Sequence, residues 1–275
     1  SHPDEYVKKL RSALVLVDID ERKNDIKKHI SEIAAKLDGK VLQDDELVNI
    51  VTNLVEYPVP VAGRFDKGYL EVPDEILINS MREHQKYFAV TDASGHLLPC
   101  FIAVNNTIAQ NMKLVAKGHE RVLRARLEDA RFFYRSDINV PPDVWVEKLK
   151  GVLFQAKLGS MYEKTERSEK IAGYLADEIS DDPEIKKRVL RAARLCKADL
   201  VSHIVGEFPK LQGVMGRIYA MNAGEERKVA LAIEEHYRPA YSGGSLPETT
   251  VGAIVGISDK IDSICGCFSA GLLPT

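Results

Sequence analysis

The chain has 275 residues, with 45% hydrophobic and 29% charged side chains and a formal net charge of -3 at pH 7. These values exclude collagen-like, fibrous and disordered classes, and no stretch approaches ~18 uninterrupted apolar residues, so we expect no membrane span. The four cysteines are too irregularly spaced for a disulfide framework and the N-terminus lacks a signal-peptide pattern, which together predict a cytoplasmic protein. The near-balanced charge argues against a surface that binds nucleic acid everywhere.

The first 115 residues predict a mixed α/β domain. Apolar residues at helical spacing predict helices within residues 3–37, 44–51 and 73–80. Strands are predicted at 87–90 and 101–104, joined as a hairpin by a turn at Asp92–Gly95. Pro58 and Pro60 predict an edge strand or an entry loop, because proline cannot donate to a central strand.

The second half predicts an all-α domain. Six segments have helical periodicity, and they cover residues 119–134, 145–159, 165–179, 182–205, 224–237 and 248–271. The first half is net acidic and the second is slightly basic. We therefore expect an α+β chain with domains at residues 1–115 and 116–275.

A stripe of basic residues lies on the first helix of the second half. Its members are Lys117, Arg121, Arg124, Arg131 and Arg135. At 100° per residue the four arginines fall within about 80° of one another. Such a stripe can contact successive phosphates without reading any base. The alternative is a solvated face, because Glu128 can pair with Arg124 or Arg131.

Ionisable residues continue the apolar stripes of three later helices, and they are Asp199, His203, His236, Asp259 and Asp262. His and Asp from three helices resemble the HD metal-dependent phosphohydrolases, where they hold a divalent metal that activates water. Where the paired His-Asp of that family stands, this chain has Lys197-Ala198-Asp199, and a lysine cation there would oppose metal binding. A buried hydrogen-bond network or a helix-packing junction is therefore the preferred interpretation of Lys197, Asp199, His236, Asp259 and Asp262, and we expect no metal.

Several blocks in sequence order resemble the beta subunit of the bacterial tetrameric glycyl-tRNA synthetase. The most extensive includes Ser80-Met81-Arg82-Glu83-His84-Gln85-Lys86-Tyr87. The blocks together are residues 71–90, 95–105, 122–134, 154–159, 196–200, 207–208, 212–216, 235–239 and 258–262. The resemblance covers essentially the whole chain, and ordered blocks are more specific than any single motif.

This resemblance implies the central part of a longer subunit, and the abrupt chain ends also suggest a fragment. It implies a domain similar to the B3/B4 domain of phenylalanyl-tRNA synthetase, followed by an HD-like helical domain. In the family the alpha subunit carries the site for glycine and ATP, while beta binds tRNA(Gly) and completes the assembly. The expected function is thus support of an aminoacyl-tRNA ligase, with tRNA contacts at the basic stripe and no catalytic residue or cofactor in this fragment.

Two other functions are compatible with parts of the sequence. One is an HD-type divalent-metal phosphohydrolase acting on nucleotides or RNA ends. The other is an editing-type domain in the α/β half that hydrolyses mischarged tRNA. The sequence offers no catalytic nucleophile paired with a general base for that reaction.

Overall fold

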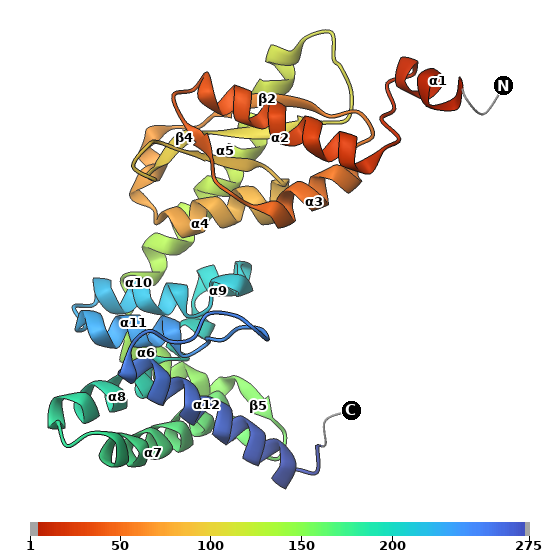
Figure 1. Ribbon diagram of the computed structural model, residues 1–275. Helices are drawn as coiled ribbons and strands as arrows, with labels where there is room; N and C mark the ends of the chain where they lie inside the picture. Colours follow the sequence, from red (N-terminus) through yellow and green to blue (C-terminus); the bar gives the residue numbers. More distant parts are fainter. Residues whose placement is uncertain (1–4, 273–275) are drawn as a thin grey trace. The chain divides into compact units, whose positions relative to one another are not determined.

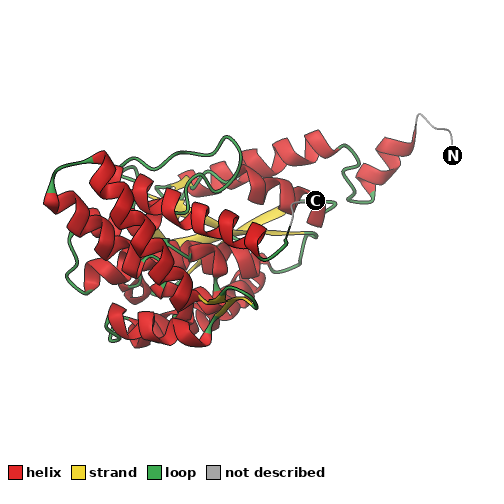
Figure 2. Ribbon diagram, turned by 90° about the horizontal axis from the view of Figure 1, so that it is seen from below, coloured by secondary structure: helices red, strands yellow, loops and turns green. Residues whose placement is uncertain are grey.

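The computed structural model describes residues 5–272, and the chain divides into two compact units, one up to Phe132 and one from Phe133. Helices make up most of both units, with few strands (Figure 1; Figure 2). No helix in the described range 5–272 is long and apolar enough to cross a membrane.

The first unit is a mixed α/β structure, as the sequence predicts. Its helices are α1 (Tyr6–Ser12), α2 (Ile19–Ala35), α3 (Asp45–Leu54), α4 (Asp74–Asn79) and most of α5 (Met112–Asp137). Its strands are β1 (Lys40–Val41), β2 (Val59–Arg64), β3 (Phe88–Thr91) and β4 (Leu97–Asn105). They form an antiparallel sheet in the order β1-β3-β4-β2. The predicted hairpin is therefore confirmed as β3 and β4, and the proline-containing segment is the edge strand β2.

One hydrophobic core holds α2 and α3 against the sheet. Helix α2 begins after Asp18, whose carboxylate accepts the Glu21 amide at 2.8 Å, as an N-cap does. Its apolar side chains recur every four residues and so face one side. The core consists mainly of Ile26, Ile30, Ala34, Leu47, Val48, Val51, Phe88, Val90 and Ile102.

The second unit is helical except for one short hairpin. Its helices are α6 (Pro142–Lys148), α7 (Met161–Ile179), α8 (Pro183–Leu195), α9 (His203–Glu207), α10 (Val214–Asn222), α11 (Arg227–Glu235) and α12 (Thr250–Ser269). The hairpin pairs β5 (Leu153–Gln155) with β6 (Gly159–Ser160). Helices α7, α8, α11 and α12 pack on one another. The α+β class is confirmed, whereas the expectation of an all-α second half is wrong at this hairpin.

The helix predicted over 145–159 ends at Lys148 and gives way to the hairpin. Gly159 has a positive φ of 84°, which L side chains rarely adopt. Ser160 then begins α7 through a capping box with Glu163. Turn geometry and capping at these residues outweigh the helical spacing of the apolar positions.

The helix predicted over 182–205 is broken into two. Helix α8 ends at Leu195, a 3₁₀ turn covers Ala198–Val201, and α9 begins at His203. Ser202 caps α9, since its hydroxyl accepts the Val205 amide at 3.2 Å. The short helix α10 does not coincide with any predicted segment.

The boundary between the compact units also differs from the predicted one after residue 115. The units divide within α5, between residues 132 and 133. The earlier turns of α5 are tied to the first unit by hydrogen bonds that the hydroxyls of Tyr87 and Tyr69 donate to His119 and Glu128. Such long-range bonds are invisible in a sequence pattern.

Candidate functional site

The basic stripe lies on α5, where one helical face is buried and the other is solvent-exposed. Leu123, Leu127 and Ala130 have at most 1% of their surface exposed and anchor the helix to its unit. Lys117, Arg121, Arg124 and Arg135 are exposed, and Arg131 is partly buried. The amphipathic pattern therefore orients the stripe toward solvent, where phosphates can reach it.

Glu128 does not neutralise the whole stripe. One of its carboxylate oxygens accepts the Tyr69 hydroxyl at 2.7 Å and the other accepts an Arg131 guanidinium N–H at 2.6 Å. Arg131 also lies over the Tyr69 ring, 4.8 Å from its centroid. Neither Arg121 nor Arg124 forms an ion pair with any residue from 5 to 272. Two guanidinium groups of the stripe thus remain available for an anion.

Beside the stripe lies a cavity of about 560 Å³ within the first unit. Helix α5 contributes Glu120, Arg124 and Arg131, while the end of β2 and the turn after it contribute the remaining side chains, which are Arg64, Phe65, Asp66 and Tyr69. Arg64 is exposed, and its guanidinium forms no ion pair in the part of the chain that the structure describes. Arg64 is a binding candidate that the sequence pattern does not indicate, because a lone arginine at a strand end has no local signal.

A hydrogen-bonded relay fixes the start of α5 on the sheet. His119 Nε2 lies 2.9 Å from Asn105 Oδ1, and the Tyr87 hydroxyl lies 2.7 Å from His119 Nδ1. The amide oxygen can only accept, so Nε2 carries the proton and Nδ1 accepts from the tyrosine. Burial lowers the pKa of His119 and raises the pKa of Tyr87 to about 12, and both shifts favour this neutral arrangement.

The relay predicts a pH dependence of stability. A His119→Gln variant should be about 1 kcal/mol less stable than the parent at pH 7, because a hydrogen bond is lost. The folded-state pKa of His119 lies below its ordinary 6.5, so the neutral imidazole stabilises the fold above pH 6.5 and this contribution is lost as pH falls through the lowered value. Urea unfolding should show a smaller stability difference between the parent and His119→Gln at pH 5 than at pH 7. A larger difference at pH 5 would contradict the assignment of a neutral His119.

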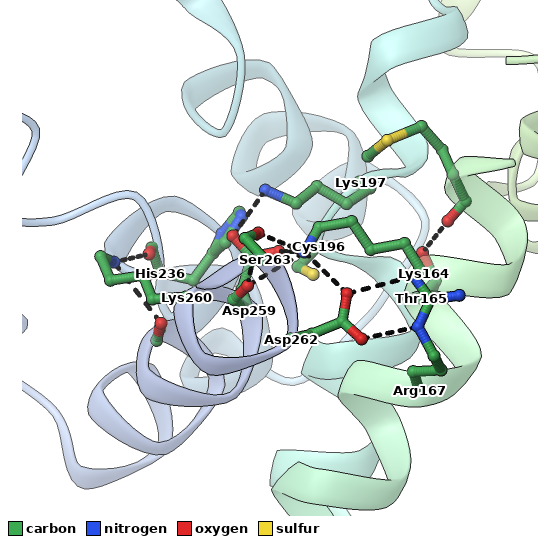
Figure 3. Close-up of polar contacts among 12 residues, drawn as sticks. Lys164, Thr165, Arg167, Cys196, Lys197, His236, Asp259, Lys260, Asp262 and Ser263 are labelled. Atoms are coloured by element: carbon green, nitrogen blue, oxygen red, sulfur yellow. Dashed lines mark hydrogen bonds and ion pairs between the residues drawn. The ribbon is translucent and has the colours of Figure 1, made fainter. Parts of the chain in front are cut away.

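Two of the ionisable residues predicted on later helices, Asp259 and Asp262, form a buried charge cluster with basic side chains of the second unit (Figure 3). Asp259 on α12 lies between two lysines, with Oδ1 3.0 Å from Lys164 Nζ and Oδ2 3.1 Å from Lys197 Nζ. Asp262 lies 3.3 Å from Lys164 Nζ and 2.6 Å from Arg167 Nε. The two lysine side chains are 3% and 7% exposed, so the carboxylates compensate charges that water does not reach.

The lysines set the protonation of this cluster. Burial alone would raise the pKa of Asp259, but the neighbouring charges of Lys197 and Lys164 dominate, and the pKa is lowered to about 2. Burial, with the charge of Lys197, holds the pKa of His236 well below its ordinary value. Asp259 is consequently ionised and His236 neutral at pH 7.

Asp199 and His236 both hydrogen-bond to backbone groups of the second unit. One Asp199 oxygen accepts the amides of Gly213 and Gly216 at 2.6 and 2.9 Å, and burial raises its pKa to about 6. The His236 ring bonds through Nδ1 to the Ile233 carbonyl at 2.5 Å. No group of three or more His, Cys, Asp or Glu side chains within residues 5–272 is placed to hold a metal ion.

His203, which continued the predicted stripe, lies at the surface with 61% of its side chain exposed. Its Nδ1 is 2.7 Å from Asp137 Oδ1, so it does not approach the cluster formed by Lys197 and Asp259. Lys164 and Arg167 are cluster members that the sequence pattern did not indicate, and Lys164 is the buried one. A lysine on a charged helix is normally solvated, and only its neighbours on α12 show that it is buried.

Comparison with known proteins agrees with the resemblance. The whole chain, residues 1–275, matches the family described as glycyl-tRNA synthetase beta subunit. The glycine–tRNA ligase beta subunit of Desulforapulum autotrophicum is 58% identical over 272 residues, which is 99% of this chain and 40% of that protein. The corresponding subunits of Desulfatibacillum aliphaticivorans and Syntrophus aciditrophicus are 54% and 50% identical, over 99% and 100% of this chain and 39% and 40% of theirs. The chain thus spans about 40% of the length of these relatives, and it belongs to the glycyl-tRNA synthetase beta subunit family.

Proposed function

We propose that this chain supports the ATP-dependent attachment of glycine to tRNA, as part of a glycine–tRNA ligase beta subunit. Family membership over residues 1–275 supports this function. ATP and glycine are bound by the alpha subunit in this proposal, and the chain contributes tRNA(Gly) binding and assembly with alpha. It has a cytoplasmic location and is inactive as an isolated piece.

The observation that carries tRNA binding is the exposed basic face of α5. Lys117, Arg121 and Arg124 lie on one face of a helix whose opposite face is buried. Recognition of an RNA duplex relies on phosphate and 2′-OH contacts more than on base reading, and a stripe of cations can provide the phosphate contacts. We therefore assign α5 to the tRNA backbone.

Reversing two charges of this face should weaken tRNA binding. The variant Lys117→Glu, Arg121→Glu leaves Arg131 untouched, because Arg131 holds Glu128 and Tyr69 in place. We expect the affinity for tRNA to fall at least tenfold at low salt, and the slope of log affinity against log salt to lose about one unit per lost phosphate contact. Fluorescence anisotropy with labelled tRNA between 50 and 200 mM salt, roughly, measures both.

Arg126→Glu is the matched control, since Arg126 is exposed on the same helix but about 200° around it from Arg124. Its effect on tRNA binding should be much smaller. Equal losses of tRNA affinity in the double variant and the control would show that the effect comes from net charge and not from this face of α5. An unchanged affinity in the double variant would refute the interface. Aminoacylation by alpha with the longer beta subunit, carrying the same substitutions, then links binding to activity.

We assign the first unit to the B3/B4-like class and the second to the HD-like class. The buried charge cluster favours a packing junction in the second unit over the phosphohydrolase alternative. The ammonium groups of Lys164 and Lys197 already lie beside Asp259, at 3.0 and 3.1 Å. A divalent cation at the same carboxylate would be repelled by both.

A further inference from the structure

From the cavity beside α5 we infer that the first unit holds a single ribonucleotide, with its phosphate between Arg64 and Arg124. This binding site goes beyond the backbone contacts proposed above. It depends on Arg64 of β2, which is not on the α5 face, so it can be tested separately. The ligand chemistry is a nucleotide unit, supplied either as a free nucleotide or by an RNA strand.

The charges lining the cavity favour an anion at one place in it. Arg64 and Arg124 both line it and have no ion-pair partner within residues 5–272. Arg131 is a fixed wall of the cavity, because it is held by Glu128 and lies over Tyr69. Two unpaired guanidinium groups from separate elements can bond a phosphate from two sides, each as a charge-assisted hydrogen bond.

Each carboxylate that lines the cavity has one oxygen already hydrogen-bonded, and its other oxygen can accept a hydrogen bond from a ligand hydroxyl group. Glu120 Oε1 accepts the Arg64 amide at 2.9 Å, and Asp66 Oδ1 accepts the Gly68 amide at 2.7 Å. The second oxygen of each carboxylate has no hydrogen bond to a residue between 5 and 272. An anion that also carries hydroxyl donors fits this lining, whereas a bare phosphate would leave both acceptors unused.

The size of the cavity and Phe65 extend the match from a sugar phosphate to a nucleotide. About 560 Å³ lies within the usual range of small-ligand sites. Phe65 is partly exposed and lines the same cavity, so a base can lie against its ring. Phosphate, ribose hydroxyls and base thus each meet a complementary group.

Titration of the chain with AMP, followed by NMR chemical shifts, tests the site. We expect saturable binding in the millimolar range, on the order of 1 mM, and about tenfold weaker binding by Arg64→Ala. Arg64→Lys should bind with intermediate affinity, since it keeps the cation. Lys67→Ala is the matched control, because Lys67 is an exposed cation close in sequence that does not line the cavity. Far-UV circular dichroism verifies that each variant is folded.

Three results would overturn the inference: no saturable AMP binding at millimolar concentrations, AMP affinity unaffected by Arg64→Ala, or inorganic phosphate binding as tightly as AMP. Competition with a single-stranded RNA tetramer, rA4, distinguishes the sources. If rA4 displaces AMP and this displacement depends on Arg64, the site is assigned to an RNA strand. If rA4 does not displace AMP, the site is assigned to a free nucleotide.

The tRNA interface on α5 and the nucleotide site in the cavity can be refuted independently of each other. Lys117→Glu, Arg121→Glu should weaken tRNA binding and leave AMP binding unchanged, because neither residue lines the cavity. If that variant binds tRNA normally while AMP binding still depends on Arg64, the α5 interface is refuted and the nucleotide site stands.

Discussion

Replacing Asp259 with alanine should lower the free energy of unfolding of the second unit by about 3–5 kcal/mol, since removing one partner of a buried ion pair leaves the other charge uncompensated. Asp259 is the only carboxylate within 4 Å of Lys197 Nζ among residues 5–272, and it shares Lys164 with Asp262. Its loss would leave the Lys197 ammonium beside the Tyr237 ring, 4.0 Å from the centroid, with no carboxylate of the described residues within 4 Å. Urea denaturation followed by circular dichroism measures the change.

A double-mutant cycle separates the ion pair from simple loss of packing. Adding Lys197→Met to Asp259→Ala removes the uncompensated cation, so the double variant should recover much of the lost stability. Strict additivity of the two substitutions would contradict the pairing. Exposed Asp129 on α5 is a matched control, and Asp129→Ala should change stability by no more than about 0.5 kcal/mol.

Acid titration gives an independent measure of the same cluster. The pKa of Asp259 is about 2 in the folded chain, below its ordinary value of 3.8. Its stabilising contribution is therefore fully present above pH 3.8 and is lost as pH falls toward 2. The stability difference between the parent and Asp259→Ala should shrink over that interval.

Replacing Asp137 with alanine should cost about 3 kcal/mol, the second-largest effect, because several buried donors lose their acceptor together. The Asp137 carboxylate accepts the amides of His203 and Ile204, both at 3.1 Å, and the Tyr219 hydroxyl at 2.8 Å. It is 1% exposed, so water cannot replace it. The same urea experiment on the second unit measures the loss.

The conservative variant Asp137→Asn distinguishes hydrogen bonding from volume. Asparagine fills the same space but turns one acceptor into a donor, so at least one of the four hydrogen bonds to the Asp137 side chain must break. We expect the free energy of unfolding of Asp137→Asn to lie between those of the parent and of Asp137→Ala. An asparagine variant as stable as the parent would show that the bonds to Tyr219 and the α9 amides contribute little.

Local signals predicted the first unit well. The β3–β4 hairpin follows from two apolar runs flanking Asp92–Gly95, and the edge position of β2 follows from its prolines. The basic face of α5 is also a local property, since 3.6-residue periodicity alone places Arg121 and Arg124 opposite Leu123 and Leu127. Its role in RNA binding remains a prediction.

Helical periodicity was insufficient where the chain turns. The apolar pattern runs past Leu195, yet the helix ends there. The segment after it is held by bonds to distant residues, because Asp199 accepts amides of Gly213 and Gly216 and Asp137 accepts those at the start of α9. A pattern within one helix contains no information about acceptors 14 or 66 residues away along the chain.

By itself the sequence determined the class of the chain, most helix positions, the basic stripe and, through ordered blocks, the family. Only the tertiary structure decided which charges are neutralised. It placed Glu128 on Tyr69 and Arg131, left Arg64 and Arg124 beside one cavity, and buried Lys164 next to Asp259 and Asp262. The physical reason is that hydrophobic periodicity is local, whereas the electrostatic energy of a side chain depends on distance and burial in three dimensions.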